Sequence, residues 1–399
     1  MVNIGKKERI YHLDLKIEKL AIIGLIIAFS SAIVDTIWAV YLDGIFHNPS
    51  YVGFFSGFLT FISLLSFFFY IPIIERNEKD KLFTISLIVT VASLFIFSFI
   101  QNIWAIVFIS IVWVLAANLR IASFGILVKD KSKDRDLVKN EGLIYTLFNT
   151  GWLIGPLAAG FLVVKYQFTG VFLISSLLVL MSLFLFKIFK IKDKNINKKV
   201  DGDLIKNLFD FFKDKNRTIA YFISGGINFW WVLVYLFMPL YLIESGKSIS
   251  YISIFLFSVA VPTVAFGYFF AKVASKRGFK KMFITGYLIL TLAALFSFIF
   301  PVIGVVTALV VIGSIGAAMI ESTTEAYFLD ILKKRDVYRF YSPYNTTTDI
   351  NHLIAKFIPS IILLFFSYKF VFLTFAVAMF SFMILSFYTR NIIESKKKR

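Results

Sequence analysis

The sequence contains no cysteine and only three histidines among its 399 residues. Without cysteine there can be no disulfide, no thiolate metal site and no cysteine nucleophile. The three histidines, His12, His47 and His352, are too few and too scattered for a histidine metal cluster. We therefore expect no bound metal and no cofactor.

Motifs that carry familiar chemistry are missing as well. The chain has no Gly-rich phosphate loop, no His-Glu-x-x-His pair and no Gly-x-Ser-x-Gly turn. ATP-driven pumping and hydrolytic catalysis therefore have no residues to carry them, and we expect that the protein is not an enzyme. Uphill transport by such a chain would have to draw on an ion gradient.

Charged residues are scarce, at 17% of the chain, whereas hydrophobic residues make up 59%. A soluble domain needs about 25% charged residues, so a mean hydropathy of +0.81 indicates a polytopic membrane protein. The formal net charge of +18 does not indicate a nucleic-acid partner, because Lys and Arg lie in short loops between apolar runs. The expected partner is the lipid bilayer.

Twelve apolar runs are long enough to cross about 30 Å of hydrocarbon as helices. They cover residues 20–46, 51–74, 82–100, 103–128, 142–164, 169–189, 218–243, 249–272, 282–300, 302–328, 343–367 and 370–389. The first run is too long for the core of a signal peptide, usually about 7 to 15 residues, so we expect it to be retained. The predicted fold class is all-α with twelve transmembrane helices.

The longest polar segment, residues 187–217, divides the chain near its midpoint. Sliding the sequence by 200 positions sets Tyr41-Leu42 on Tyr241-Leu242, at equivalent points of two similar hydropathy profiles. A duplicated half-protein produces such a match. We predict an N-terminal six-helix half at residues 1–186, a basic linker at 187–217 and a C-terminal six-helix half at 218–399.

The basic residues indicate the orientation in the membrane. They gather in the loops on one side, together with both termini and the linker, whereas the other side carries only Lys165, Lys247 and Lys369. Because short cytoplasmic loops are enriched in Lys and Arg, both termini and the linker are predicted to be cytoplasmic. We expect a multi-pass monomer in the plasma membrane.

Charged side chains inside the apolar runs are the best functional leads, because a charge at mid-bilayer costs at least about 2.5 to 3.5 kcal/mol. Asp35, Arg120 and Glu321 lie well inside their runs. For Asp35, a role in function competes with a simple hydrogen bond between helices. Both readings remain open at this point.

A second polar cluster lies in the run at 343–367. Its members Asp349, His352 and Lys356 fall near one helix face at spacings of three and four. By helical rise, the depths of these residues allow a pair of His352 with Glu321 and a pair of Lys356 with Asp35.

Two loops at equivalent repeat positions share a charge pattern. Residues 71–80 read IPIIERNEKD and residues 271–280 read AKVASKRGFK. The matching residues are Glu75, Arg76 and Lys79 in the first loop and Lys276, Gly278 and Lys280 in the second. This pattern resembles the Gly-x-x-x-Asp-Arg-x-Gly-Arg-Arg loop of the major facilitator superfamily, although the first loop lacks both glycines. Twelve helices in two halves with a basic linker resemble that family over essentially the whole chain.

The fifth run supports the resemblance more strongly. Residues 151–160 read GWLIGPLAAG, and their Gly151, Gly155, Pro156 and Gly160 resemble the Gly-Pro motif of helix 5. In the family this motif is associated with antiporters that exchange drugs and protons. Glycines at four-residue spacing also let two helices approach closely, so ordinary tight packing is the alternative.

In the resembled fold, helices 1, 4, 7 and 10 line a central cavity. The resemblance therefore implies that Asp35, Arg120 and Glu321 face water and substrate. The seventh run would add Asn228, Trp230, Trp231 and Tyr235. An aromatic wall with few charged anchors suits a bulky, amphipathic or cationic ligand. The alternative for the two tryptophans is a position facing lipid.

The resemblance implies a secondary active transporter that moves a small-molecule substrate as its two halves rock. We expect proton-coupled export of small amphipathic or cationic compounds, with Asp35 as the titrating group beside Arg120. A metabolite or sugar permease of the same fold is one alternative. A receptor or lipid scramblase that does not transport solutes is another.

Overall fold

The structure is a computed structural model, and it describes residues 15–132, 137–192, 204–333 and 336–393. All regular secondary structure in these residues is helical. The all-α fold class predicted from the sequence is confirmed. Residues 193–203 of the predicted linker lie outside the described residues.

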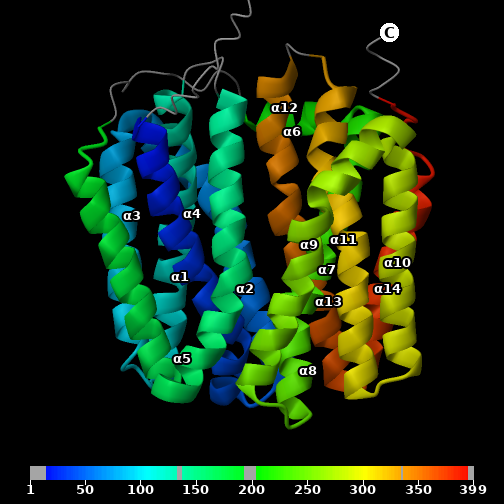
Figure 1. Ribbon diagram of the computed structural model, residues 1–399, viewed down its shortest axis with the longest axis horizontal. Coiled ribbons are helices and arrows are strands. Elements are labelled where there is room, and N and C mark those ends of the chain that lie inside the picture. Colours follow the sequence, from blue (N-terminus) through cyan, green and yellow to red (C-terminus); the bar gives the residue numbers. More distant parts are fainter. Residues whose placement is uncertain (1–14, 133–136, 193–203, 334–335, 394–399) are drawn as a thin grey trace, which may run out of the picture.

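The first half of the chain forms five helices. They are α1 (Leu15–Phe46), α2 (Pro49–Arg76), α3 (Lys79–Phe97), α4 (Ile103–Lys131) and α5 (Leu137–Ile188). α5 contains two of the predicted spans, because the chain turns at Gln167, whose φ of 56° and ψ of −171° are not helical. Its two arms run between the same two ends of the molecule (Figure 1).

The second half begins after the short helix α6 (Leu204–Phe212). Its helices are α7 (Lys215–Val232), the π-helical turn η2 (Leu233–Phe237), α8 (Met238–Glu244), α9 (Ile249–Arg277), α10 (Phe279–Ile299), α11 (Ile303–Ile331), α12 (Val337–Asn345), α13 (Thr347–Phe365) and α14 (Lys369–Ser386). α7, η2 and α8 together make one span, as do α12 and α13. Eleven helical stretches among the described residues are long and apolar enough to span a membrane. With α5 counted twice, they match the twelve predicted spans.

The helices alternate in direction, so their loops lie at two ends of the molecule (Figure 1). One end carries the start of α1, the end of α14 and the helix α6, together with most loop Lys and Arg residues; we call it the basic end. The other end is called the opposite end. Its helix starts are capped by polar side chains: Asn48 accepts a hydrogen bond from the Ser50 nitrogen at 2.8 Å, and Asn102 accepts one from the Trp104 nitrogen at 3.0 Å. These caps satisfy backbone N–H groups that no helix carbonyl can reach.

The glycine motif of α5 packs this helix onto α1. A Cβ atom at Gly151 would lie 2.8 Å from the Phe29 nitrogen, and one at Gly155 would collide with Ala32. The absence of side chains at these two positions lets the backbones approach closely. Gly151 and Gly155 therefore have the role in close helix packing that the sequence analysis gave as the alternative to an antiport role.

The two halves touch along two seams, where α2 packs on α13 and α5 packs on α9. In the first seam, a Cβ atom at Gly57 would lie 2.7 Å from the Phe357 ring. In the second, a Cβ atom at Gly160 would lie 2.7 Å from the Ser253 Cβ. All four residues lie on the stretches of their helices nearest the opposite end. The halves are therefore closely packed at the opposite end.

The buried apolar residues extend this contact. The core of the second half includes Trp230, Tyr287 and Phe328, and it continues into Leu42 of α1 and Val52 of α2. Both of these residues are fully buried and lie next to the loop between α1 and α2 at the opposite end. Hydrophobic burial across the halves therefore holds this end of the molecule together.

Candidate functional site

The site is built first around Arg120 of α4, whose side chain is buried with 8% of its surface exposed. Its Nη1 donates a hydrogen bond to Thr90 Oγ1 of α3 at 3.2 Å. Asp35 of α1 is partly buried, and its carboxylate is attracted electrostatically by Lys356 and by Arg120. One acid in the first half thus interacts with a cation from each half.

Lys356 of α13 links the two halves. Its Nζ donates hydrogen bonds to Thr60 Oγ1 at 2.8 Å and to the Ser56 carbonyl oxygen at 3.4 Å, both on α2. The ammonium group also interacts with the charges of Asp349 and Asp35. Lys356 therefore interacts electrostatically with Asp35, while its hydrogen bonds go to α2.

Asp349 belongs to a second polar link between the halves. Its Oδ1 accepts a hydrogen bond from Ser63 Oγ of α2 at 3.1 Å. Asn118 Nδ2 of α4 donates to Ser63 Oγ and to Ser66 Oγ, each at 2.8 Å. The polar side chains of α2, α4 and α13 thus form one connected network. The charge that acts on His352 is that of Lys356, and the structure shows no pair of His352 with Glu321 among the described residues.

Glu321 is exposed although it lies ten residues, about 15 Å by helical rise, before the end of α11 at Ile331. The Trp231 side chain lies close enough to interact with the Glu321 carboxylate. The charge of Glu321 also acts on Tyr235 of η2 and on Tyr145 of α5. These partners come from both halves, so Glu321 faces the space between them.

Three aromatic rings form a wall beside Glu321. The ring centroids of Trp231 and Tyr235 lie 5.8 Å apart at an interplanar angle of 44°, and those of Tyr235 and Trp152 lie 6.0 Å apart at 75°. Trp152 was not among the predicted site residues. With Tyr145 it falls on one face of α5, at a spacing of seven, which the sequence already shows.

The position of Tyr235 depends on a departure from regular helix. Tyr235 lies in the middle of η2, where the span changes from α-helical to π-helical hydrogen bonding. Single π-helical turns inside helices occur frequently at functional sites. Nothing in the apolar sequence LVYLF signals this turn.

Trp230 and Asn228 do not join the wall. Trp230 is completely buried inside the second half, where a Cβ atom at Gly313 of α11 would lie 2.6 Å from its ring. Neighbouring residues on a helix point about 100° apart, so Trp230 and Trp231 cannot both face the space between the two halves. Asn228 is partly buried, and its Nδ2 donates to the Ser224 carbonyl oxygen of its own helix at 3.4 Å.

The predicted loop motifs lie at the basic end, away from the charged groups. Gly278 ends α9 with a φ of 93°, a conformation that favours glycine, and begins the turn into α10. Lys280 Nζ donates to the Phe387 carbonyl oxygen at 2.6 Å. Of the other motif residues, Arg76 and Lys276 are exposed and Lys79 is buried. The side chain of Glu75 is not among those that the structure describes.

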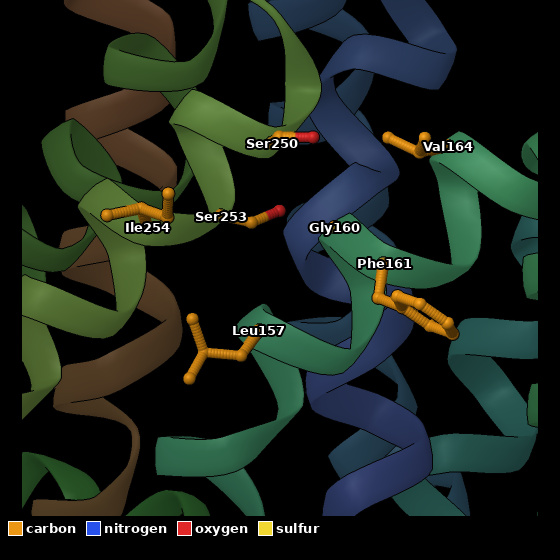
Figure 2. A pocket seen from close by; sticks show the side chains of 7 residues that line it. All are labelled: Leu157, Gly160, Phe161, Val164, Ser250, Ser253 and Ile254. Atoms are coloured by element: carbon orange, nitrogen blue, oxygen red, sulfur yellow. The ribbon is translucent and has the colours of Figure 1, made fainter.

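A small cavity of about 300 Å³ lies on the seam between α5 and α9 (Figure 2). It is lined by Leu157, Gly160, Phe161, Val164, Ser250, Ser253 and Ile254. Figure 2 shows Ser253 of α9 pointing toward the α5 backbone at Gly160. No charged side chain lines this cavity, so it is separate from the cluster around Asp35.

Comparisons with known proteins agree on the fold. A model of the Major Facilitator Superfamily matches residues 20–261 and 231–399. A search of curated proteins finds no match.

The solved structures include several that are similar to this chain. A variant of the nucleoside transporter NupG has a TM-score of 0.77 at 13% identity, over 92% of this chain and 99% of that one. The NupG structure without that substitution has a TM-score of 0.74 at 13% identity, over 94% of this chain and 100% of that one. A POT family transporter in complex with 5-aminolevulinic acid has a TM-score of 0.75 at 12% identity, over 93% of this chain and 95% of that one.

Proposed function

Because the chain belongs to the Major Facilitator Superfamily, we propose that it is a secondary active transporter that exports small amphipathic or cationic compounds in exchange for protons. The observation that carries this proposal is the placement of Asp35, Arg120 and Lys356 inside membrane-spanning helices of both halves. Charged groups at such depth are costly, so they persist where function needs them.

Asp35 is the proposed coupling group. A carboxylate binds a proton more tightly when neighbouring cations withdraw and releases it when they return. Arg120 belongs to the same half as Asp35, whereas Lys356 belongs to the other and is hydrogen-bonded to α2. Movement of the halves would therefore change the distance from Asp35 to Lys356 and leave that to Arg120 nearly unchanged. In this way the proton affinity of Asp35 follows the conformation.

The proposed state of the structure is open toward the basic end. The halves are closely packed at the opposite end, and Glu321 and Tyr145 are exposed on the basic-end side. The positive charges of the basic end favour a cytoplasmic location. A substrate would then enter from the cytoplasm and leave after the halves rock to open the opposite end.

The test of this function is Asp35→Asn in proteoliposomes with an imposed pH gradient. The amide keeps the size of the side chain but cannot take up or release a proton, so uphill transport should be lost while exchange of substrate at equal concentrations continues. Glu18→Gln, at the start of the same helix, is the matched control and should transport normally. Uphill transport by Asp35→Asn at the wild-type rate would exclude Asp35 as the coupling group.

A further inference from the structure

We propose that Glu321 and the aromatic side chains around it form a binding subsite for an organic ammonium cation. This inference rests on the proposed function, because it names the substrate class of the same central space. The subsite consists of the side chains of Glu321, Trp231, Tyr235, Trp152 and Tyr145.

Glu321 has no counter-ion within the part of the chain that the structure describes. Deep inside the spans, Arg120 interacts with Asp35, and Lys356 interacts with Asp349 and Asp35. Among the described residues, no Lys or Arg pairs with Glu321, which interacts with the Trp231 side chain. A charged carboxylate at this depth is stabilised by a positive partner. Since its side chain is exposed, a ligand can supply that charge.

The side chains around Glu321 are mostly aromatic. An ammonium group is attracted to the face of an aromatic ring within about 6 Å of the ring centre, and most strongly to tryptophan. The rings of Trp231, Tyr235 and Trp152 follow one another at centroid distances of 5.8 Å and 6.0 Å. Aromatic faces next to one carboxylate recognise an alkylated amine through its charge and its apolar surface together.

The same geometry argues against a metal ion. Hard cations such as Ca²⁺ and Mg²⁺ need several oxygen ligands. Among the described residues, no group of three His, Cys, Asp or Glu side chains could hold a metal. Glu325, one helical turn from Glu321, accepts a hydrogen bond from Tyr341 Oη at 2.6 Å. Glu321 is thus the carboxylate that lies next to Trp231 and Tyr235, and a single carboxylate there matches a monovalent organic cation.

The subsite also includes both halves of the protein. Tyr145 and Trp152 come from α5 in the first half, whereas Trp231, Tyr235 and Glu321 come from the second. A cation bound between them would contact both halves at once. Its binding would therefore be sensitive to the rocking that separates α5 from η2.

The experiment uses calorimetric titration of the purified full-length protein at pH 8 with benzyltrimethylammonium. Benzyl alcohol, which has the ring without the charge, is the neutral comparison. We expect the cation to bind wild-type protein and Glu321→Gln to weaken that binding by about tenfold or more. Trp152→Leu should weaken it several-fold, and Glu18→Gln, at the start of α1, should leave it unchanged. Neither Glu321→Gln nor Glu18→Gln should alter the binding of benzyl alcohol, because that ligand carries no charge.

Two results would overturn the subsite: no binding of the cation to wild-type protein, or equal binding to wild-type and Glu321→Gln. Melting temperatures of the variants in detergent show whether each is folded, and Trp231→Phe provides a second, milder change at the same wall. Failure here is distinct from failure of proton coupling. Cation binding that depends on Glu321 without flux driven by a pH gradient would retain the subsite and reject the coupling, and the reverse result would reject only the subsite.

Discussion

At the scale of single residues, glycines determine how closely the first half can pack. Gly151 lies where a Cβ atom would be 2.8 Å from a backbone nitrogen of α1 and 3.1 Å from the Ala28 Cβ. Backbone atoms cannot rotate away as a flexible side chain can, so an added methyl group must push the helices apart. Gly142 on the same helix has nothing within 4 Å of its Cβ position.

Gly151→Ala should destabilise the protein by about 1 to 3 kcal/mol, the usual cost of overpacking a well-packed contact. Gly142→Ala is the matched control, and it should be neutral or stabilise by up to about 1 kcal/mol, because alanine favours helix. The measurement is the apparent melting temperature of both variants in the same detergent. Equal melting temperatures would show that α1 and α5 are not held together at Gly151.

The sequence indicated which helices contribute to the site better than it indicated where each side chain points. Trp230 and Trp231 were predicted for the same role. In the structure Trp230 is in the core of the second half, whereas Trp231 interacts with Glu321. In a soluble helix, polar residues mark the outer face. In a membrane span the lipid face is as apolar as the core, so the pattern does not distinguish the two tryptophans. Trp152 was missed for the same reason.

At the scale of elements, α6 connects the linker to the second half at the basic end. Phe211 of α6 is fully buried, and the guanidinium of Arg217 lies 4.1 Å from the ring centre of Phe340 in α12. Asp210 of α6 forms an ion pair with Arg339 of α12. The short helix is therefore held by one buried ring and one carboxylate. Such a helix is too short to be stable in water alone.

The charge of Asp210 predicts a pH dependence for the docking of α6. A hydrogen bond from Lys213, together with the charges of Lys213 and Arg339, holds the pKa of Asp210 below its ordinary value. Because the pKa is lower in the folded state, the stabilisation is complete above about pH 4, the ordinary value for Asp, and is lost as the pH falls through the folded value.

Hydrogen exchange of the amides in α6 measures this docking. Asp210→Asn should speed their exchange at neutral pH and remove the further loosening that acid causes in the wild-type protein. Glu78→Gln, which neutralises an acid paired with Lys81 at 3.0 Å in the other half, is the control. If α6 exchanged equally fast in wild-type and Asp210→Asn, the ion pair with Arg339 would have no part in docking.

Long elements were predicted and short ones were not. Each span contains enough apolar residues to cross the membrane by itself, so its existence follows from composition. The turn at Gln167 was predicted, because the apolar run is interrupted there by Lys165 and Gln167. The helix α6 and the π-helical turn η2 depend on contacts with distant segments. The segment of α6 does carry an amphipathic pattern, with Leu204, Leu208 and Phe211 at spacings of four and three, but it was predicted as part of the polar linker.

At the scale of the whole molecule, the apolar runs predicted the twelve spans and the internal repeat predicted two halves, but neither predicted which conformation the halves adopt. A transporter that alternates between two states exchanges one set of contacts between its halves for another, and one sequence must allow both. The structure shows the set at the opposite end, where Gly57 faces Phe357 and Gly160 faces Ser253. We expect these contacts to separate during each transport cycle.

A disulfide across the seam tests whether this separation is required. The Cβ position at Gly160 lies 2.7 Å from the Ser253 Cβ, so a small outward shift would bring cysteines at these positions to the usual Cβ separation of about 3.8 Å. The natural sequence contains no cysteine, so Gly160→Cys with Ser253→Cys creates the only pair. Oxidation should cross-link the halves and stop transport in proteoliposomes.

The controls separate the cross-link from the substitutions that create it. Each single variant, Gly160→Cys or Ser253→Cys, should transport equally with and without oxidant, because one cysteine cannot bridge the seam. Reduction of the double variant should restore its flux, which excludes damage to the fold as the cause. Rocking must open the opposite end to release substrate. If the fully cross-linked protein transported as fast as the same protein with its disulfide reduced, α5 and α9 would have to remain in contact throughout the cycle. The seam that separates would then have to be the one between α2 and α13, where Lys356 Nζ donates a hydrogen bond to Thr60 Oγ1 at 2.8 Å.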